Sequence, residues 1–232
     1  PRVGVSGRRR RSRTLPRVRR LPGREEQGER LGLSIPHREP RRPFSYKESL
    51  RQLLNPLVRL LSRMRVRPDT LTFLGWTFAC VSAVLFGLGY VPLAGAVMLF
   101  GGLFDALDGA VARASDRMSD FGAFLDSTLD RISEAVVFVG IIFYYAASDR
   151  PYEALLAGAA MTFSLLTSYT RARAEGLGVR CEVGLLERAG RVVLLSVFSI
   201  LGFLTLGVGL VAAGALVTTV QRILHVRRET RA

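Results

Sequence analysis

The sequence predicts an all-α integral membrane protein with six transmembrane helices, preceded by an amphipathic helix in the membrane interface. Two observations support this fold class. Hydrophobic residues make up 49% of the 232 residues, and after residue 67 they gather in long apolar runs. The net charge is +14, but residues 1–44 hold fourteen Arg and four Glu, a net charge of +10, which leaves +4 for the remaining chain. A single soluble domain does not combine such apolar runs with so basic a first segment.

The first of three predicted domains is a disordered, basic N-terminal arm over residues 1–44. This segment is rich in Arg, Pro and Gly, and its few apolar residues show no sustained period. Such a composition does not bury enough apolar surface to fold. A basic arm can bind nucleic acid or anionic lipid head groups. Next to a membrane domain we expect membrane lipids and no nucleic acid, and an arm without a binding role is the alternative.

The second predicted domain, residues 45–66, is an amphipathic juxtamembrane helix. Its leucines recur at helical spacing with basic residues between them (Leu50, Leu53, Leu54, Leu57, Leu60 and Leu61, with Lys47, Arg51, Arg59 and Arg63). A helix with one apolar and one basic face lies in the membrane interface. Packing against the protein's own spans is the alternative, and both can hold together.

The third predicted domain, residues 67–232, contains the six spans. Each apolar run has about 20 residues, the length that a bilayer requires. We place the spans near residues 70–90, 92–112, 120–146, 152–172, 189–206 and 208–226. The last break, from Gly207 to Gly209, is the weakest, because residues 192–220 are almost continuously apolar. Two tilted spans fit this run better than one span does.

The distribution of Arg and Lys predicts the orientation of these spans. On one side, the breaks near residues 89–92 and around Leu206 carry no Lys or Arg, and the break at 148–151 carries only Arg150. The opposite ends of the spans are rich in arginine (Arg113, Arg117, Arg171, Arg173, Arg180, Arg188, Arg191, Arg222, Arg227, Arg228 and Arg231). The positive-inside rule therefore predicts a multi-pass protein of the cytoplasmic membrane, with both termini and the active site on the cytoplasmic side.

Four aspartates between residues 103 and 132 are the main candidates for catalysis. Asp105 and Asp108 are three residues apart and Asp126 and Asp130 are four apart, so on helices each pair shares one face. Carboxylates beside apolar runs are costly, and four of them together indicate a functional site rather than a solvated loop. Oxygen ligands without His or Cys suit Mg²⁺ or Mn²⁺, and two such ions can promote displacement at phosphorus.

The four aspartates belong to a longer pattern, D-x2-D-G-x2-A-R-x8-G-x3-D-x3-D, whose other fixed positions are Gly109, Ala112, Arg113 and Gly122. This pattern resembles the signature of the CDP-alcohol phosphotransferases, integral membrane enzymes of phospholipid synthesis. The resemblance extends over residues 45–230, and so leaves out only the basic arm. It implies a CDP-activated lipid such as CDP-diacylglycerol as one substrate, and a homodimer.

Within this pattern, Asp130 is the expected general base, because a carboxylate beside the metal can accept the proton of an attacking hydroxyl. Asp130 is also a candidate metal ligand, and both roles stay open. Gly109 and Ala112 would let the nucleotide lie against the helix backbone, and Arg113 would reach a phosphate. A plain positive-inside anchor is the alternative for Arg113.

The start of the first span completes the expected site for the CDP-lipid. Pro68, Asp69 and Thr72 have the residue types of an ordinary helix start, and a plain cap is one interpretation. The resemblance adds a second, because the family's P-[ND]-x-x-T sequence borders the cytidine-nucleotide pocket. The residues expected to bind the CDP-lipid are therefore Pro68, Asp69, Thr72, Asp105, Gly109, Ala112 and Arg113.

Three arginines are candidates for binding a phosphorylated acceptor. The stretches S-Y-T-R-A-R-A-E, E-R-A-G-R and Q-R are similar to the phosphatidylinositol-phosphate synthase branch of the family, in which they form a basic pocket for inositol phosphate. Carried over residue by residue, the resemblance names Arg171, Arg191 and Arg222. The chain departs from the branch at Ala189 and Gly190, where members often have Pro and Glu.

The expected reaction is the transfer of a phosphatidyl group from CDP-diacylglycerol, or from a CDP-activated ether lipid, to a hydroxyl of inositol phosphate, with release of CMP. Glycerol 3-phosphate or another alcohol is the alternative acceptor. Intramembrane prenyltransferases also use Asp-rich helices, but their Asn-Asp-x-x-Asp spacing does not occur here. A transporter needs polar groups at the membrane midplane, where these spans are apolar. A lipid-binding scaffold would not explain the aspartates.

Overall fold

A computed structural model describes residues 68–114 and 119–231 of the chain, and for residues 68, 69, 108, 109 and 112–114 it describes the backbone alone. All these residues belong to one unit of the chain, Tyr46–Ala232. The predicted basic arm and the predicted amphipathic helix lie outside the described residues, so both stay predictions.

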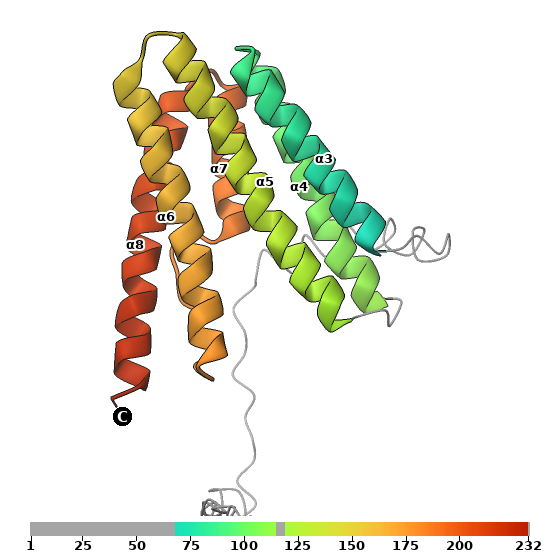
Figure 1. Cartoon of the computed structure of the whole chain (residues 1–232), viewed down its shortest axis with the longest axis vertical. Helices are drawn as coiled ribbons and strands as arrows, with labels where there is room; N and C mark the ends of the chain where they lie inside the picture. Colours follow the sequence, from blue (N-terminus) through green and yellow to red (C-terminus); the bar gives the residue numbers. More distant parts are fainter. Residues whose placement is uncertain (1–67, 115–118, 232) are drawn as a thin grey trace, which may run out of the picture. The chain divides into compact units, whose positions relative to one another are not determined.

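Six helices make up the described part of the chain, which contains no strand, and the all-α class is confirmed (Figure 1). They are α3 (Pro68–Gly87), α4 (Val91–Ala114), α5 (Asp120–Ala147), α6 (Pro151–Gly176), α7 (Arg188–Ile200) and α8 (Leu204–Glu229). Two of them, over Thr70–Gly87 and Leu204–Glu229, are long and apolar enough to cross a membrane, and Val91–Leu107 is a shorter apolar segment.

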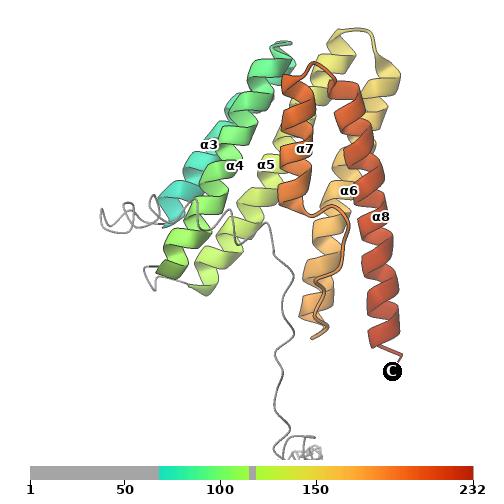
Figure 2. The ribbon, with the colours of Figure 1, turned by 180° about the vertical axis from the view of Figure 1, so that it is seen from behind.

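The six helices pack side by side in a ring with the order α3, α4, α7, α8, α6 and α5 (Figures 1 and 2). Helices that follow each other in the sequence run in opposite directions. The beginnings of α3, α5 and α7 and the ends of α4, α6 and α8 therefore lie toward the same end of the ring. We call this the aspartate end. The apolar core of the ring includes Phe86, Phe138, Ile141, Val208 and Val211, all at most 1% exposed.

Polar side chains and glycine hold neighbouring helices together. Ser82 on α3 donates a hydrogen bond to the Ala94 carbonyl on α4 at 2.9 Å, and Thr167 on α6 donates to the Ala215 carbonyl on α8 at 3.0 Å. At Gly140 on α5, any Cβ would overlap the Ala83 carbonyl oxygen of α3. Close approach at small residues, with hydrogen bonds between helices, is the usual packing of apolar helices in membranes.

The boundary between the last two helices differs from the prediction. The sequence analysis placed it at Gly207 to Gly209, but α7 ends at Ile200 and α8 begins at Leu204. Gly202 adopts a φ of +80°, and the Phe203 amide donates to the Phe198 carbonyl at 2.8 Å, which closes the end of α7. Gly207 instead lies inside α8 against Phe198. The 13 residues of α7 extend about 20 Å, less than a hydrocarbon core of about 30 Å.

The segment between α6 and α7 returns along α8 (Figure 2). The Leu186 amide donates to Thr218 Oγ1 at 2.9 Å, and the Leu185 amide donates to Gln221 Oε1 at 3.0 Å. This return explains why α7 is short. The helix begins part of the way along the length of the bundle, rather than level with the ends of α6 and α8. Arg188 and Arg191, the first and fourth residues of α7, therefore also lie part of the way along the bundle.

Candidate active site

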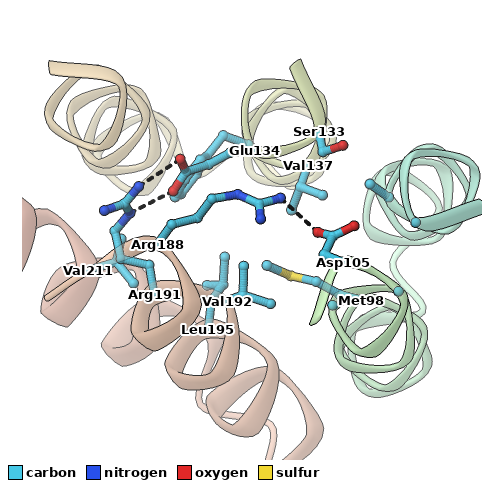
Figure 3. Close-up of a pocket in the computed structure, with 15 residues that line it drawn as sticks. Met98, Asp105, Ser133, Glu134, Val137, Arg188, Arg191, Val192, Leu195 and Val211 are labelled. Carbon is cyan, nitrogen blue, oxygen red and sulfur yellow. Dashed lines mark hydrogen bonds and ion pairs between the residues drawn. The ribbon is translucent and has the colours of Figure 1, made fainter. Parts of the chain in front are cut away.

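Asp105 and Asp130, two of the predicted metal ligands, meet at the guanidinium of Arg188. Arg188 Nη2 lies 2.9 Å from Asp105 Oδ2 on α4, and Arg188 Nη1 lies 2.8 Å from Asp130 Oδ1 on α5. The three side chains are only about one-fifth exposed, at 24%, 19% and 22%. Figure 3 shows the Arg188 side chain reaching from α7 across the pocket to Asp105. Three helices thus contribute one charged group each to the same point.

A fourth helix, α3, determines where Asp105 can lie. Asp105 Oδ1 is so close to Gly75 that a Cβ at this position would overlap it. Only glycine leaves room for the carboxylate at this contact between α3 and α4. Asp105 is therefore held from two sides, by the backbone of α3 at one oxygen and by Arg188 at the other.

Asp126 lies one helical turn before Asp130 on α5 and is half-buried. It is close enough to Arg188 and Asp105 for both charges to act on it. Asp108 lies three residues after Asp105 on α4, where the structure describes the backbone alone. The predicted convergence of carboxylates is thus observed for Asp105 and Asp130, with Asp126 nearby, while the position of the Asp108 side chain stays a prediction.

These residues fit a divalent cation by their chemistry. Among the described side chains, no three acidic, His or Cys residues surround one point closely enough to form a ready metal cluster. Asp105 and Asp130 nevertheless each direct an oxygen at the Arg188 guanidinium, at 2.9 Å from Nη2 and 2.8 Å from Nη1. Carboxylate oxygens alone are the donors that Mg²⁺ and Mn²⁺ prefer. A cation in place of the guanidinium would meet the same two oxygens.

Arg191, predicted to bind the acceptor phosphate, forms a buried ion pair with Glu134 of α5 (Figure 3). Arg191 Nε and Nη2 lie 2.7 and 2.8 Å from the two oxygens of Glu134, and the side chains are 2% and 5% exposed. Arg191 also donates to the carbonyls of Leu186 and Ser164. Nearly all its donors are therefore engaged within the protein.

The other two predicted arginines are Arg171, in the last turns of α6, and Arg222 of α8, which contacts α6 at Thr167. Arg222 of α8 is 3% exposed and donates to the Thr167 carbonyl at 2.5 Å and to the Val183 carbonyl at 2.9 Å. Arg171 is on the surface of α6, where it pairs with Glu175 at 2.9 Å. Arg191, Arg222 and Arg171 thus reach successive turns of one helix, but Arg171 alone among these three is exposed.

The predicted nucleotide-binding residues are only partly described. Pro68 is the first residue of α3, as the sequence predicts for a helix start, and Thr72 in the next turn is 6% exposed. Gly109, Ala112 and Arg113 occupy the last turns of α4. For these three residues, as for Pro68 and Asp69, the structure describes the backbone only, so their contacts with a nucleotide stay a prediction.

Sequence reasoning missed two residues of this site, Glu134 and Arg188. Glu134 follows Asp130 by four residues and so continues the face of α5 that begins at Asp126. Arg188 precedes Arg191 by three residues, on the same face of α7. Both spacings are visible in the sequence, but the pairing between the two faces depends on how α5 and α7 pack.

Two hollows adjoin Arg188 and Asp105. A small cavity of about 30 Å³ is lined by Asp105, Glu134, Arg188 and Arg191 together with apolar residues of five helices (Figure 3). A larger groove of about 600 Å³ runs between α4 and α7 (Ala96, Leu99, Phe100, Gly102, Leu103, Asp105, Ala106, Arg188, Ala189, Val192, Val193 and Ile200). This groove is apolar along its length and ends at two charged side chains.

Comparison with known proteins gives the same family as the sequence pattern. The family model for CDP-alcohol phosphatidyltransferases matches residues 65–221. The archaetidylinositol phosphate synthase of Methanothermobacter thermautotrophicus is 34% identical over 188 residues, which cover 78% of this chain and 92% of that protein.

Solved structures of the phosphatidylinositol phosphate synthase of Mycobacterium tuberculosis share the fold. The structure with CDP-DAG bound has a TM-score of 0.67 and 34% identity, and the match covers 75% of this chain and 94% of that one. The structure in complex with manganese and citrate has a TM-score of 0.67 and 35% identity, and covers 74% and 88%. This chain therefore belongs to the CDP-alcohol phosphatidyltransferase family, membrane-associated transferases of phospholipid synthesis.

Proposed function

We propose that this enzyme transfers the phosphatidyl group of CDP-diacylglycerol, or the equivalent group of a CDP-activated ether lipid, to a hydroxyl of inositol phosphate and releases CMP. One observation carries the proposal: Asp105 and Asp130 converge on one cationic group where the apolar groove between α4 and α7 ends. This supports a site for charged phosphates beside a surface for hydrocarbon. The relatives support it, since one is named an archaetidylinositol phosphate synthase and the other a phosphatidylinositol phosphate synthase.

The groove between α4 and α7 suits the lipid tails. Leu99, Phe100, Val193 and Ile200 line it with apolar side chains, and Asp105 lies at its charged end. Hydrocarbon in this groove would leave the diphosphate beside Asp105. The CMP portion would extend toward Pro68, Asp69, Thr72, Gly109, Ala112 and Arg113, the residues that the family pattern assigns to the CDP-lipid. Binding of CDP-DAG by the Mycobacterium tuberculosis relative supports this arrangement.

The metal site in this proposal consists of Asp105, Asp108, Asp126 and Asp130, which would hold two ions of Mg²⁺ or Mn²⁺. The presence of manganese in a solved relative supports the use of a divalent cation. When bound, such ions neutralise the diphosphate and stabilise the negative charge that develops on the departing CMP. The helices that carry the four carboxylates, α4 and α5, both pack against α3, which supports a fixed arrangement of the site.

Asp130 acts in this proposal as the general base. Its carboxylate accepts the proton of the acceptor hydroxyl, and the hydroxyl oxygen forms a bond to the lipid-bearing phosphorus. The bond from this phosphorus to the oxygen of CMP breaks, and CMP leaves with the electron pair. The products are the phosphatidylated acceptor, CMP and one proton, so the reaction is balanced.

The acceptor phosphate is bound in this proposal by Arg171, Arg191 and Arg222. Arg171 is the exposed member, and it can exchange its surface partner Glu175 for a phosphate at little cost. Arg191 and Arg222 lie behind it against the carbonyls of Ser164 and Thr167, where their charges favour an anion at the end of α6. The exposed guanidinium of Arg171 suits a phosphate monoester because it can donate two N–H bonds to it in fixed geometry.

The proposed setting is the cytoplasmic membrane, with all six helices as spans, an interfacial helix before them and the aspartate end facing the cytoplasm. Large apolar side chains that point outward support contact with lipid, among them Val84, Phe143 and Leu155 at 61%, 62% and 73% exposed. The short α7 fits this setting if its first residues lie within the membrane boundary rather than at the surface. A homodimer is proposed from the family resemblance alone.

The choice of acceptor can be tested directly. Purified protein would be given CDP-diacylglycerol, Mg²⁺ or Mn²⁺, and one candidate alcohol at a time, and CMP release would be measured. We expect the fastest release with inositol phosphate. Faster release with glycerol 3-phosphate, serine or free inositol would reject the proposed acceptor, and no release with any alcohol would reject the transfer reaction.

A further inference from the structure

We propose that Arg188 occupies the place between Asp105 and Asp130 that a divalent cation would take, and that it competes with that cation for their oxygens. The inference rests on the metal site of the proposed function. It adds Arg188, which is not one of the four aspartates of the family pattern, to that site. Binding of the cation then requires Arg188 to withdraw, so that metal binding is coupled to the start of α7.

The geometry of the contacts supports competition rather than coexistence. Arg188 uses one terminal nitrogen for each carboxylate, at 2.9 Å to Asp105 Oδ2 and 2.8 Å to Asp130 Oδ1. The other oxygen of Asp105 lies against Gly75, where no space remains for a Cβ. The oxygen that Arg188 holds is therefore the one that Asp105 presents to the interior of the site. A cation and the guanidinium would need the same oxygen and would also repel each other.

Arg188 is free to move in a way that Arg191 is not. Arg191 is held by both oxygens of Glu134 and by the carbonyls of Leu186 and Ser164. Arg188 contacts the two aspartates through its terminal nitrogens, and its buried Nε has no hydrogen-bond partner among the described residues.

The charges around Arg188 explain why a guanidinium occupies this place at all. Asp105 of α4 and Asp130 of α5 meet at Arg188, with Asp126 one turn before Asp130, and repulsion between these carboxylates would be large in a weakly solvated site. Glu134 contributes further negative charge, but its two oxygens are taken by Arg191. Arg188 neutralises the aspartates without filling the site permanently. It can yield to a cation of higher charge.

The test is a titration of Mn²⁺, followed by electron paramagnetic resonance, on the full chain in lipid nanodiscs without CDP-lipid. Arg188→Gln should tighten Mn²⁺ binding by at least about tenfold, because it removes one positive charge a few ångström from the ion. The same substitution should lower the melting temperature of the protein in EDTA and enlarge its rise on adding Mn²⁺. Arg173→Gln, at an exposed position of α6, removes the same charge away from the site and should change neither quantity.

Unchanged or weaker Mn²⁺ binding by Arg188→Gln would overturn the inference while leaving the metal site intact. If the wild-type chain binds no Mn²⁺, or if Asp105→Asn binds it equally well, the proposed metal site itself is wrong and the inference falls with it. Should Arg188→Gln not fold, Arg188→Lys provides the same test. Its single ammonium cannot span both carboxylates in the manner of a guanidinium. It should tighten Mn²⁺ binding less than Arg188→Gln but measurably, and no change would overturn the inference.

Discussion

At the scale of single residues, the site contains two ion pairs that join α5 to α7 one turn apart. Asp130 and Glu134 are one turn apart on α5, and Arg188 and Arg191 are three residues apart on α7. Each arginine takes the acidic partner at its own level, Arg188 with Asp130 and Arg191 with Glu134. The pair of Arg191 and Glu134 is buried and multiply bonded, whereas Arg188 is shared between two aspartates. We therefore expect the Arg191–Glu134 pair to stabilise the fold beside any effect of its charge on an acceptor, and the contacts of Arg188 to respond to what binds the aspartates.

The first prediction concerns the buried pair. Glu134→Gln leaves the charge of Arg191 without a counter-charge at 2% exposure, and loss of one partner from such a pair costs about 3–5 kcal/mol. The free energy of unfolding in mixed detergent measures this cost. The matched control is Glu153→Gln, whose partner Arg150 is an exposed cation at 2.7 Å, and which should change stability little. Equal losses of unfolding free energy in Glu134→Gln and Glu153→Gln would show that the buried pair contributes no more to stability than the exposed pair does.

A second prediction at this scale concerns Gly75. Alanine at this position would force Asp105 away from its present place, since the added Cβ overlaps Asp105 Oδ1. Displacement of a catalytic group by about 1 Å can lower a rate by about a hundredfold, so Gly75→Ala should slow CMP release by between about tenfold and a hundredfold. In Gly158→Ala the new Cβ meets nothing within 4 Å on α6, and the rate should be unchanged. A full rate for Gly75→Ala would mean that the position of Asp105 is not critical.

At the scale of helices, the residue types predicted where most helices begin and end, but they did not predict the boundary between α7 and α8. Pro151 at the start of α6 and Ser119, whose Oγ caps α5, are visible start signals, and the helices follow them. The boundary between α7 and α8 has two candidate glycines within one apolar run, Gly202 and Gly207. The composition does not predict which of these two glycines lies in the turn between the helices. The positive φ of Gly202 and the contact of Gly207 with Phe198 decide it only in the folded chain.

The turn yields a third prediction. Gly202 has a φ of +80° and nothing within 4 Å of its ideal Cβ, so backbone conformation alone opposes a side chain there. Gly202→Ala should lower the free energy of unfolding by about 1 kcal/mol, and Gly202→Asn should cost less, because Asn visits the left-handed region more readily. If Gly202→Ala instead stabilised the protein, as alanine does inside a helix, the chain from α7 to α8 would be continuous.

At the scale of the whole molecule, the sequence predicted the aspartate site better than the arginine site. The D-x2-D and D-x3-D spacings place carboxylates on helix faces, and Asp105 and Asp130 do meet. Arg191 and Arg222 were visible as arginines, but their partners Glu134, Val183 and Thr167 come from positions 57, 39 and 55 residues away. No local pattern predicts such contacts, because they depend on how helices that are distant in the sequence come together in the folded chain.

The central claim is that Asp105 and Asp130 form the centre that transfers a lipid phosphate to inositol phosphate. Its most direct test is the initial rate of CMP release from CDP-diacylglycerol and inositol phosphate, with and without EDTA. Asp105→Asn and Asp130→Asn should each lower the rate by at least about a hundredfold, and EDTA should abolish it. Asp149→Asn should retain the full rate, because this exposed residue follows α5 at its far end and its φ of 56° suits Asn. A rate near that of the wild type in either site variant, or in EDTA, would contradict the claim.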